Sequence, residues 1–540
     1  MRKKAMALLL SAVLTMTGVV PAFAADDITE PVTIAASEGE EKDVKVGNVT
    51  ITSEVEQEED AVKADADGGN ITLKTGDING SGEGSVEGAF ISVSKGGKAV
   101  ADLGAVRTNG EGACAESYDA GSKIDLTVGN INSQDTGLVA FTENGAETDI
   151  ETGSIISEDY AAYIETSGEG SKFNALIDGS ISSGERGMQV GASNGGEANV
   201  FVTSDVYGDG DGACLFAESG GKASAMIAGN AVSGDKRDVL FSGNAVSSVA
   251  YGDGSEADIL VGGDAIAKNN YGAAVNIENA DGGKNSITIG GTVKGGGTPI
   301  VMFQGSDINN VNITVWKVEP NANGVIAGIE NEDGSVSQST ELEKSINYII
   351  QLEDTSGARL SAQDTAHEGE KVVLKIDVDS DYELRGAFNG KGEKVALLKD
   401  ENGEYYVIVP RGGGVYLSVD LHRKEKDNDK KDDNIIIPNS GISEGASYAT
   451  ADAFNSSAAS MIASAAPGAS VTINGTSFTG ISAAVVAALM ARSDVTFVLT
   501  YTLNGVTFVV TIPAGTNLAG FLNAQGGIDF ASLAAFTALG

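Results

Sequence analysis

The sequence predicts a mostly β protein: a parallel β-helix of about eleven coils of ~25 residues, then a small β-rich module and a C-terminal α+β module. Three observations predict it. Short β-branched runs that end in glycine recur between residues 45 and 335 with a period near 25. A second glycine-rich turn follows an apolar burst in many copies, as at 88–98 and 212–222. This period indicates a solenoid, because a propeller blade needs ~40 residues and the leucine-rich repeat frame is absent.

The clearest copies of the repeat are ITLKTGDI at 71–78 and IDLTVGNI at 124–131. Apolar and polar residues alternate before the glycine, which predicts short strands with one buried side. Because neighbouring coils stack ~4.8 Å apart, equivalent residues should form columns along the solenoid. The equivalent positions are Gly47, Gly76, Gly104, Gly129, Gly153, Gly179, Ser204, Gly229, Gly263, Gly291 and Trp316. The residues expected to point into the core include Ile71, Leu73, Ile124, Leu126, Leu176 and Ile287.

One column of charged residues follows the glycine-rich turn and alternates in sign from Lys123 onward. Its members are Lys98, Lys123, Glu147, Lys172, Glu197, Lys222, Glu256 and Lys284. Two interpretations are open, a salt-bridge ladder on a solvated corner and an ion-binding ladder. Exposed pairs contribute only ~0–1 kcal/mol each, so a salt-bridge ladder would control register more than stability.

The two cysteines, Cys114 and Cys214, both follow Gly-Ala in an apolar burst. They occupy the same coil position four coils apart, on the order of 19 Å along the solenoid. A disulfide needs Cα atoms within ~7 Å, so we expect two free, buried thiols.

The first 24 residues have the features of a secretory signal peptide. Arg2, Lys3 and Lys4 precede an apolar stretch that ends in Ala-Phe-Ala at 22–24, which predicts cleavage between Ala24 and Ala25. We expect 25–45 to cap the first coil and 46–342 to form the β-helix. No later apolar run reaches ~18 residues, and no LPxTG-type sorting motif is present. These features predict a secreted protein or a cell-surface protein held by non-covalent contacts.

The period is lost near residue 345, and β-type runs at 346–352, 369–376, 405–410 and 415–421 predict a β-rich module over 343–422. HEGEKVVLKIDVDSDYEL at 367–384 and YVIVP at 406–410 resemble the internalin-type B-repeat of Gram-positive surface proteins. The usual tryptophan of that repeat is missing, and Phe388 lies near its place. The resemblance covers under a sixth of the chain and implies a spacer or adhesive role without catalytic residues.

A mixed-charge segment, RKEKDNDKKDD at 423–433, predicts a flexible linker over 423–447. The rest of the chain, 448–540, is rich in alanine and predicts an α+β module. Helices are expected at 450–465, 481–492, 518–522 and 530–539, with hairpins at 471–478 and 495–512 around two Asn-Gly turns. The module is similar to C-terminal modules of secreted proteins of Gram-positive anaerobes, to which no activity is attached.

Composition narrows the classes of partner. The chain has 35 Lys+Arg against 76 Asp+Glu, a formal net charge of −41, which disfavours nucleic acid and anionic membranes. It contains none of the common zinc, phosphate-loop, redox or serine-hydrolase motifs. No cofactor is expected, although the Asp-Gly-Asp-Gly at 209–212 leaves calcium open.

The candidate binding residues are Arg186, Asp209, Asp211, Lys236 and Arg237, which fall at similar points of three successive coils. The coil that holds Lys236 and Arg237 is also the longest, and long loops of solenoids often bind ligands. No catalytic residue is assigned, and the solenoid aromatics are sparse and scattered in the sequence, which predicts no platform for sugar stacking. The sequence therefore favours a non-catalytic surface or adhesion protein that contacts an extracellular glycan or a surface protein. The alternative is a polysaccharide lyase or glycoside hydrolase that acts on the β-helix face.

Overall fold

The computed structural model describes residues 27–424 and 451–529, apart from 54–58, 236–242, 354–356, 390–393, 396, 466–468, 475–479, 493, 504–505 and 513–527. Four predicted segments lie entirely or almost entirely outside the described residues. They are the signal peptide with Ala24 and Ala25, the linker from residue 425 on, and the helices expected at 518–522 and 530–539. The chain divides into two compact units, one that holds most of the solenoid and one that holds most of the chain from Lys344 on.

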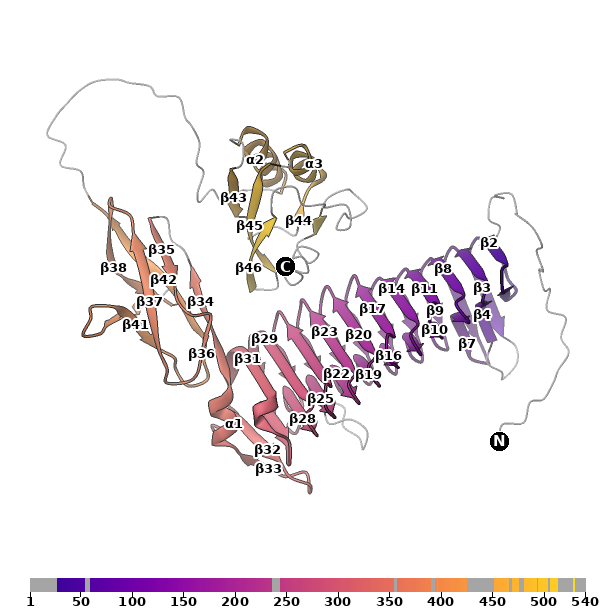
Figure 1. Cartoon of the computed structure of the whole chain (residues 1–540), viewed down its shortest axis with the longest axis horizontal. Helices are drawn as coiled ribbons and strands as arrows, with labels where there is room; N and C mark the ends of the chain where they lie inside the picture. Colours follow the sequence, from indigo (N-terminus) through magenta and orange to yellow (C-terminus); the bar gives the residue numbers. More distant parts are fainter. Residues whose placement is uncertain are drawn as a thin grey trace. The chain divides into compact units, whose positions relative to one another are not determined.

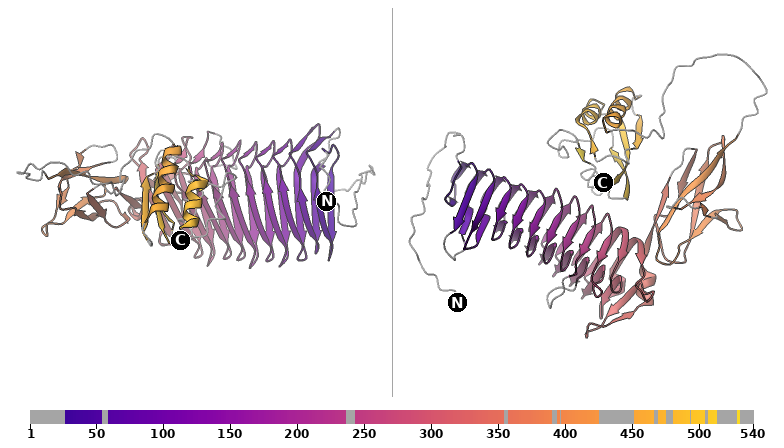
Figure 2. Two further views of the ribbon diagram at one scale, coloured as in Figure 1. Left: turned by 90° about the horizontal axis from the view of Figure 1, so that it is seen from above. Right: turned by 180° about the vertical axis from the view of Figure 1, so that it is seen from behind.

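The first unit is a parallel β-solenoid with three strand ladders, each of which runs from coil to coil (Figure 1; Figure 2, right). Ladder 1 consists of β1 (Val32–Ser37), β4 (Glu59–Asp67), β7 (Val86–Ser94), β10 (Ala113–Tyr118), β13 (Leu138–Glu143), β16 (Ala162–Ser167), β19 (Met188–Ser193), β22 (Ala213–Glu218), β25 (Val246–Tyr251), β28 (Val275–Ala280), β30 (Ile300–Phe303) and β32 (Ala327–Glu330).

Ladder 2 follows ladder 1 within each coil. It consists of β2 (Glu41–Lys45), β5 (Asn70–Lys74), β8 (Lys98–Leu103), β11 (Lys123–Val128), β14 (Glu147–Thr152), β17 (Lys172–Ile177), β20 (Glu197–Val202), β23 (Lys222–Ile227), β26 (Glu256–Val261), β29 (Lys284–Lys294) and β31 (Val311–Glu319).

Ladder 3 completes each coil with a short strand. It consists of β3 (Val49–Ser53), β6 (Ile78–Gly82), β9 (Val106–Thr108), β12 (Ile131–Ser133), β15 (Ile155–Ser157), β18 (Ile181–Ser183), β21 (Val206–Gly208), β24 (Ala231–Ser233), β27 (Ala265–Ala267) and the last residues of β29.

The predicted fold class is confirmed, and the number of coils slightly exceeds the expected eleven. Ladder 1 belongs to a 13-stranded sheet whose last strand, β33 (Val336–Gln338), is antiparallel to β32, which leaves twelve parallel strands among the described residues. The glycine landmarks also mark the true register of ladder 3. Gly129 and Gly153, for example, each lie two residues before the paired residues Ile131 and Ile155.

Tight turns with left-handed backbone connect ladders 1 and 2. Asn144 and Gly145 have φ angles of 57° and 85°, and Asn194 and Gly195 repeat the pattern two coils later with 53° and 80°. Asparagine and glycine tolerate this region better than other residues, which explains why the second sequence landmark is glycine-rich. The turn therefore fixes where each ladder 2 strand begins.

The core lies inside the three ladders and is filled by alternate residues of each strand. Ile71, Leu73 and Ile124 are buried as predicted. The prediction for Leu176 is wrong, because its side chain is outward and only half-buried while Phe173 and Ile177 of the same strand are buried. Val128 and Ile177 occupy the same position at the end of their strands, but Gly129 follows Val128 directly, whereas Asp178 separates Ile177 from Gly179. A shift of one residue turns a strand side chain to the other face, so alignment on the glycine assigned the wrong face.

The register of the charged column is confirmed from Lys98 to Glu256, since each member pairs with the next along ladder 2. Two of its steps form ion pairs, Lys123–Glu147 at 3.0 Å and Lys222–Glu256 at 3.2 Å. These exposed pairs support the salt-bridge interpretation and contribute at most ~1 kcal/mol each.

The solenoid ends near residue 345 with η1 (Ile308–Asn310), β33 and α1 (Thr340–Ser345). The predicted β-rich module follows and consists of β34 (Asn347–Glu353), β35 (Ala358–Ser361), β36 (Thr365–Ala366), β37 (Lys371–Val378), β38 (Tyr382–Phe388), β39 (Lys394–Val395), β40 (Leu398–Lys399), β41 (Tyr405–Ile408) and β42 (Val415–Arg423). All four strands expected here are present. β38 lies in the stretch that resembles the B-repeat and was not among the strands predicted.

The C-terminal module has helices α2 (Ala451–Ser464) and α3 (Ala483–Ala491) and strands β43 (Ser470–Asn474), β44 (Gly480–Ile481), β45 (Thr496–Leu503), β46 (Val506–Ile512) and β47 (Ile528–Asp529). The β45–β46 hairpin is confirmed. The predicted hairpin at 471–478 is wrong about the partner of its first strand, because that strand, β43, pairs in parallel with β45. Phe454, Val485 and Phe497 are buried in the core of this module. No helix among the described residues is long and apolar enough to cross a membrane.

The two cysteines are free and buried, as predicted. Both lie in one column of ladder 1. Cys114 pairs with Val139, and the column continues through Tyr163 and Gln189 to Cys214, four strands along. Complete burial raises the pKa of Cys214 to about 12, although the nearby Arg186 opposes the shift.

We therefore predict that thiol reagents label the native protein slowly at neutral pH, because little thiolate forms and the sulfur atoms are inaccessible. Two thiols per chain should react once the protein is denatured. A chromogenic disulfide reagent followed over hours measures both rates. A Cys114–Cys214 disulfide detected by mass spectrometry would contradict the observed register.

Candidate functional site

The candidate site lies in the loops that enter ladder 1, because the three described residues singled out from the sequence belong to these loops. Arg186 precedes β19, and Asp209 and Asp211 precede β22. The structure brings Arg186 and Asp211 together across neighbouring coils. Lys236 and Arg237 lie outside the described residues.

Arg186 and Asp211 form a buried ion pair. The Nη2 atom of Arg186 lies 3.0 Å from Oδ2 of Asp211, and the two side chains are only 11% and 5% exposed. The other oxygen of Asp211 accepts the backbone N–H of Asn244 at 2.9 Å. The guanidinium also donates to Oε1 of Gln189. Both charges are thus used within the fold, where they join three successive coils, and a ligand would have to displace them.

Asp209 lies apart from this pair despite its closeness in sequence. Its Oδ1 accepts a hydrogen bond of 2.8 Å from the hydroxyl of Tyr207, and Nζ of Lys268 lies 4.9 Å from the Tyr207 ring centroid. The two aspartates of the Asp-Gly-Asp-Gly segment therefore do not converge. Among the described residues, no group of three or more His, Cys, Asp or Glu side chains is placed to hold a metal ion. Calcium binding stays a prediction without structural support.

Three aromatic rings form a cluster beside Arg186 that the sequence analysis missed. The Arg186 guanidinium carbon lies 5.4 Å from the Tyr160 ring centroid. Tyr160 packs edge-on against Tyr163 at 5.7 Å, and Tyr163 lies 6.0 Å from Phe141. The expectation of scattered aromatics is therefore wrong for these coils. The missed signal was that Phe141 and Tyr163 lie on the same outward side of the neighbouring strands β13 and β16, two register positions apart, since Phe141 pairs with Glu165 and Tyr163 with Val139.

A row of three carboxyl groups, Asp135, Asp159 and Glu185, occupies the same loop position of three successive coils. Backbone hydrogen bonds set this spacing, from the N–H of Gly137 to the Tyr160 carbonyl and from the N–H of Ala161 to the Arg186 carbonyl. Burial, then the hydrogen bond and negative charge of Glu185, and then the charge of Asp135, together raise the pKa of Asp159 to about 6. At least one carboxyl of this row is therefore protonated in mildly acidic solution. We name Asp135, Asp159 and Glu185 together the carboxyl row.

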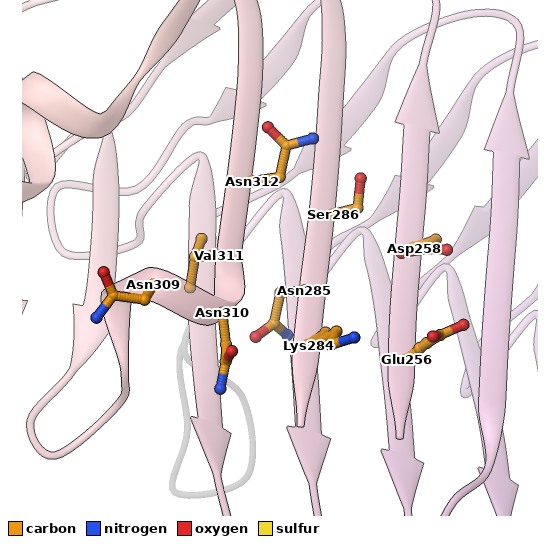
Figure 3. A pocket seen from close by; sticks show the side chains of 9 residues that line it. All are labelled: Glu256, Asp258, Lys284, Asn285, Ser286, Asn309, Asn310, Val311 and Asn312. Atoms are coloured by element: carbon orange, nitrogen blue, oxygen red, sulfur yellow. The ribbon is translucent and has the colours of Figure 1, made fainter. Parts of the chain in front are cut away.

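A second feature is a shallow hollow of about 370 Å³ on ladder 2, near the end of the solenoid (Figure 3). Two carboxylates, one lysine and several carboxamides line it: Glu256, Asp258, Lys284, Asn285, Ser286, Asn309, Asn310, Val311 and Asn312. Burial, followed by the negative charge of Glu256, raises the pKa of Asp258, while Lys222 opposes the shift. Apart from Val311, the residues that line the hollow are polar, and none of them is aromatic. The sequence analysis missed it because its lining comes from three successive strands of ladder 2 and from η1.

No family model, no curated protein and no solved structure matches this chain. The chemistry of the site must therefore be inferred from its own residues. An aromatic cluster beside a row of carboxyl groups offers stacking surfaces and hydrogen-bond acceptors at intervals of one coil.

We predict that Arg186→Ala lowers the free energy of unfolding by about 3–5 kcal/mol, because it leaves the buried Asp211 carboxylate without its counter-charge. Chemical denaturation at neutral pH measures the change. Arg107→Ala is the matched control, since Arg107 lies 3.5 Å from Asp77 but both side chains are half exposed. The control should change stability by no more than about 0.5 kcal/mol. Equal losses in the two variants would show that the Arg186 pair is not structural.

We also predict a pH-dependent effect of Asp159→Asn. The folded-state pKa of Asp159, about 6, lies above the ordinary value near 3.9, so the protonated form favours folding. Its contribution is complete below about pH 4 and is lost as the pH rises through 6. The variant should therefore be more stable than the parent at pH 7.5, by up to about 1 kcal/mol for this partly solvated group, and no more stable at pH 4. Denaturation curves at the two pH values measure this, and an equal gain at both would contradict it.

Proposed function

We propose that the protein is exported and non-catalytic, and that its acidic β-solenoid contacts an extracellular glycan or surface protein in the manner of an adhesin. The observation that carries the proposal is the aromatic cluster of Phe141, Tyr160 and Tyr163 beside the carboxyl row. Sugar rings stack on aromatic faces, and sugar hydroxyls donate to carboxylates, so this combination suits a polysaccharide. The cationic and apolar segments at residues 2–20 support export.

The repeat of the solenoid supports an extended rather than a single-residue ligand. Each coil presents its loop ~4.8 Å from the next, and the carboxyl row spans three coils, that is, two such steps. A chain-like ligand could therefore make similar contacts on several coils. The module over 343–422, with its resemblance to B-repeats, would then act as a spacer, and the protein would be held at the cell surface by non-covalent contacts.

The carboxyl row also gives the rival function, a glycoside hydrolase or polysaccharide lyase, a specific basis. A carboxyl with a pKa near 6 beside a second carboxyl is suited to general acid catalysis. The separation argues against it, because glycosidases hold their two carboxyls ~5 Å or more apart around the bond to be cleaved. Here Asp159 is close enough to Glu185 and Asp135 to share hydrogen bonds with them, which is closer than that separation.

The test incubates the protein with a panel of acidic and neutral polysaccharides, with and without calcium. Binding is followed by sedimentation with insoluble glycans, and turnover by new reducing ends or unsaturated products. We predict binding without turnover, and a loss of roughly 3- to 10-fold in affinity for Phe141→Ala because a stacking face is removed. Tyr251→Ala, which removes an exposed ring at the far end of a ladder 1 strand, is the matched control and should bind normally.

Turnover that disappears in Asp159→Asn or Arg237→Ala would establish the enzyme instead. Binding that Phe141→Ala and Tyr251→Ala weaken equally would place the ligand elsewhere on the protein. Failure to bind any glycan, with binding to a surface protein that Phe141→Ala weakens, would retain the adhesion role and change the class of ligand.

A further inference from the structure

The outer face of ladder 2 carries three regular columns of side chains over the six strands from β14 to β29. The charged column is Glu147, Lys172, Glu197, Lys222, Glu256 and Lys284. The polar column is Asp149, Asn174, Asn199, Ser224, Asp258 and Ser286. The third column is Glu151, Leu176, Phe201, Met226, Leu260 and Thr288, and we call it the apolar column after its four central members. The last strand is in the same register, because the N–H of Lys284 donates to Ser255 just as the N–H of Glu256 donates to Gly221.

Four adjacent members of the apolar column form an exposed hydrophobic stripe. Leu260 is 38% exposed, and Leu176, Phe201 and Met226 are half-buried on the outward side of their strands. A continuous apolar stripe beside charged residues is typical of a protein contact surface. The stripe is not evident from the sequence, because the repeat predicts Leu176 in the core.

We propose that a second copy of this chain covers the stripe in an antiparallel arrangement, with a two-fold axis parallel to the strands between β20 and β23. Such an axis keeps each residue's position along its strand and reverses the order of the coils. The stripe then packs against itself, with Phe201 opposite the partner's Met226 and Leu176 opposite the partner's Leu260. This is an isologous contact, the commonest kind in homodimers.

Charge complementarity selects this arrangement. Glu197 meets the partner's Lys222, Lys172 meets the partner's Glu256, and Glu147 meets the partner's Lys284. Each pair occurs twice, and all of them have opposite signs because the column alternates and the axis passes between two of its members. The polar column also avoids like charges, since Asp258 meets the partner's Asn174 and Asp149 meets the partner's Ser286.

The competing two-fold arrangement fails on the same residues. An axis along the solenoid would keep the coil order and exchange the edges of the strands. The charged column would then lie against the apolar stripe, and its charges would be desolvated without counter-charges. In addition, Lys172 and Glu197 at the centre of the proposed contact form no ion pair with another described residue within 4.0 Å, unlike the neighbouring Lys222 and Glu256.

The hollow near the end of the solenoid also fits this contact. Glu256 and Asp258 project from one strand and Lys284 and Ser286 from the next, on the same outer face (Figure 3). The partner's Lys172 and Asn174 would lie over the two carboxylates. Six strands ~4.8 Å apart and ~20 Å long give roughly 600 Å² per partner, so about 1,200 Å² in total. That is the lower limit for a specific interface and predicts a concentration-dependent dimer.

The test uses complementary charge reversal in the full chain. Glu197→Lys places lysine opposite the partner's Lys222, and Lys222→Glu places glutamate opposite the partner's Glu197. Each variant alone should lose self-association, with a dissociation constant raised by on the order of tenfold or more. An equimolar mixture should dimerise again, because both cross-contacts then have opposite signs. Sedimentation velocity over concentrations on the order of 1–100 µM measures the three samples and the parent.

Lys98→Glu is the matched control, since Lys98 lies in the same column but beyond the proposed overlap, and it should dimerise like the parent. Unaltered thermal unfolding of the separate variants would show that they fold. A monomeric parent over the whole range, or a mixture that stays monomeric, would overturn the proposal.

Cross-linking tests the direction of packing. A bismaleimide should link Asn174→Cys chains to Asp258→Cys chains in a mixture, because these residues face one another across the axis and the native cysteines are buried. Asn174→Cys chains that link efficiently to one another would show the parallel arrangement and contradict ours, because in our arrangement these two residues lie three coils, ~14 Å, apart along the solenoid. This inference does not depend on the adhesion proposal, because a non-adhesive or catalytic protein could dimerise through the same face.

Discussion

The register of backbone hydrogen bonds between successive coils is the constraint on which the rest of this molecule depends. In ladder 2, Lys123 pairs with Glu147 and Glu147 with Lys172, and the same one-to-one match holds along ladders 1 and 3. Every side chain therefore repeats at the spacing of one coil, whether it points inward or outward. The core needs this match so that one apolar layer meets the next. The surface inherits it, and columns of charges, carboxyls and apolar groups are its consequence.

This constraint explains what the sequence could predict and what it could not. Glycines such as Gly129 and Gly153 recur because ladder 3 begins two residues later, so the period revealed the fold class and the register of that ladder. Leu176 could not be placed by the same route. An extra residue in the corner after β17 changes the count from glycine back to strand, and a strand reverses its faces with each residue. The fold tolerates this addition at a corner, where no ladder pairing is lost, and the sequence does not show at which corner it sits.

The candidate site shows a second limit, set by burial. Arg186 and Asp211 were identified from the sequence as charged residues at similar points of neighbouring coils, and they do meet. Their meeting inside the protein makes them a structural pair, and no pattern of charges in a sequence reveals how much solvent reaches a loop. Phe141, Tyr160 and Tyr163 were missed for a related reason. Two belong to strands of ladder 1 and one to a loop, and only the stacking of coils places these rings together.

The excess of acid gives the columns their physical importance. Like charges one coil apart repel at ~5 Å, and the whole chain has 76 acidic against 35 basic residues, so the solenoid must limit that repulsion along each column. Ladder 2 does so by alternating the sign of its charged column and by placing asparagines between Asp149 and Asp258, where Asn174 donates to Asp149 at 2.9 Å. The loops that enter ladder 1 do so through the raised pKa of Asp159, about 6, which burial and the neighbouring Glu185 and Asp135 cause. The first solution makes a face that is complementary to its own reversed copy, and the second makes a face whose charge depends on pH. The two faces are thus suited to different partners, although one repeat generates both.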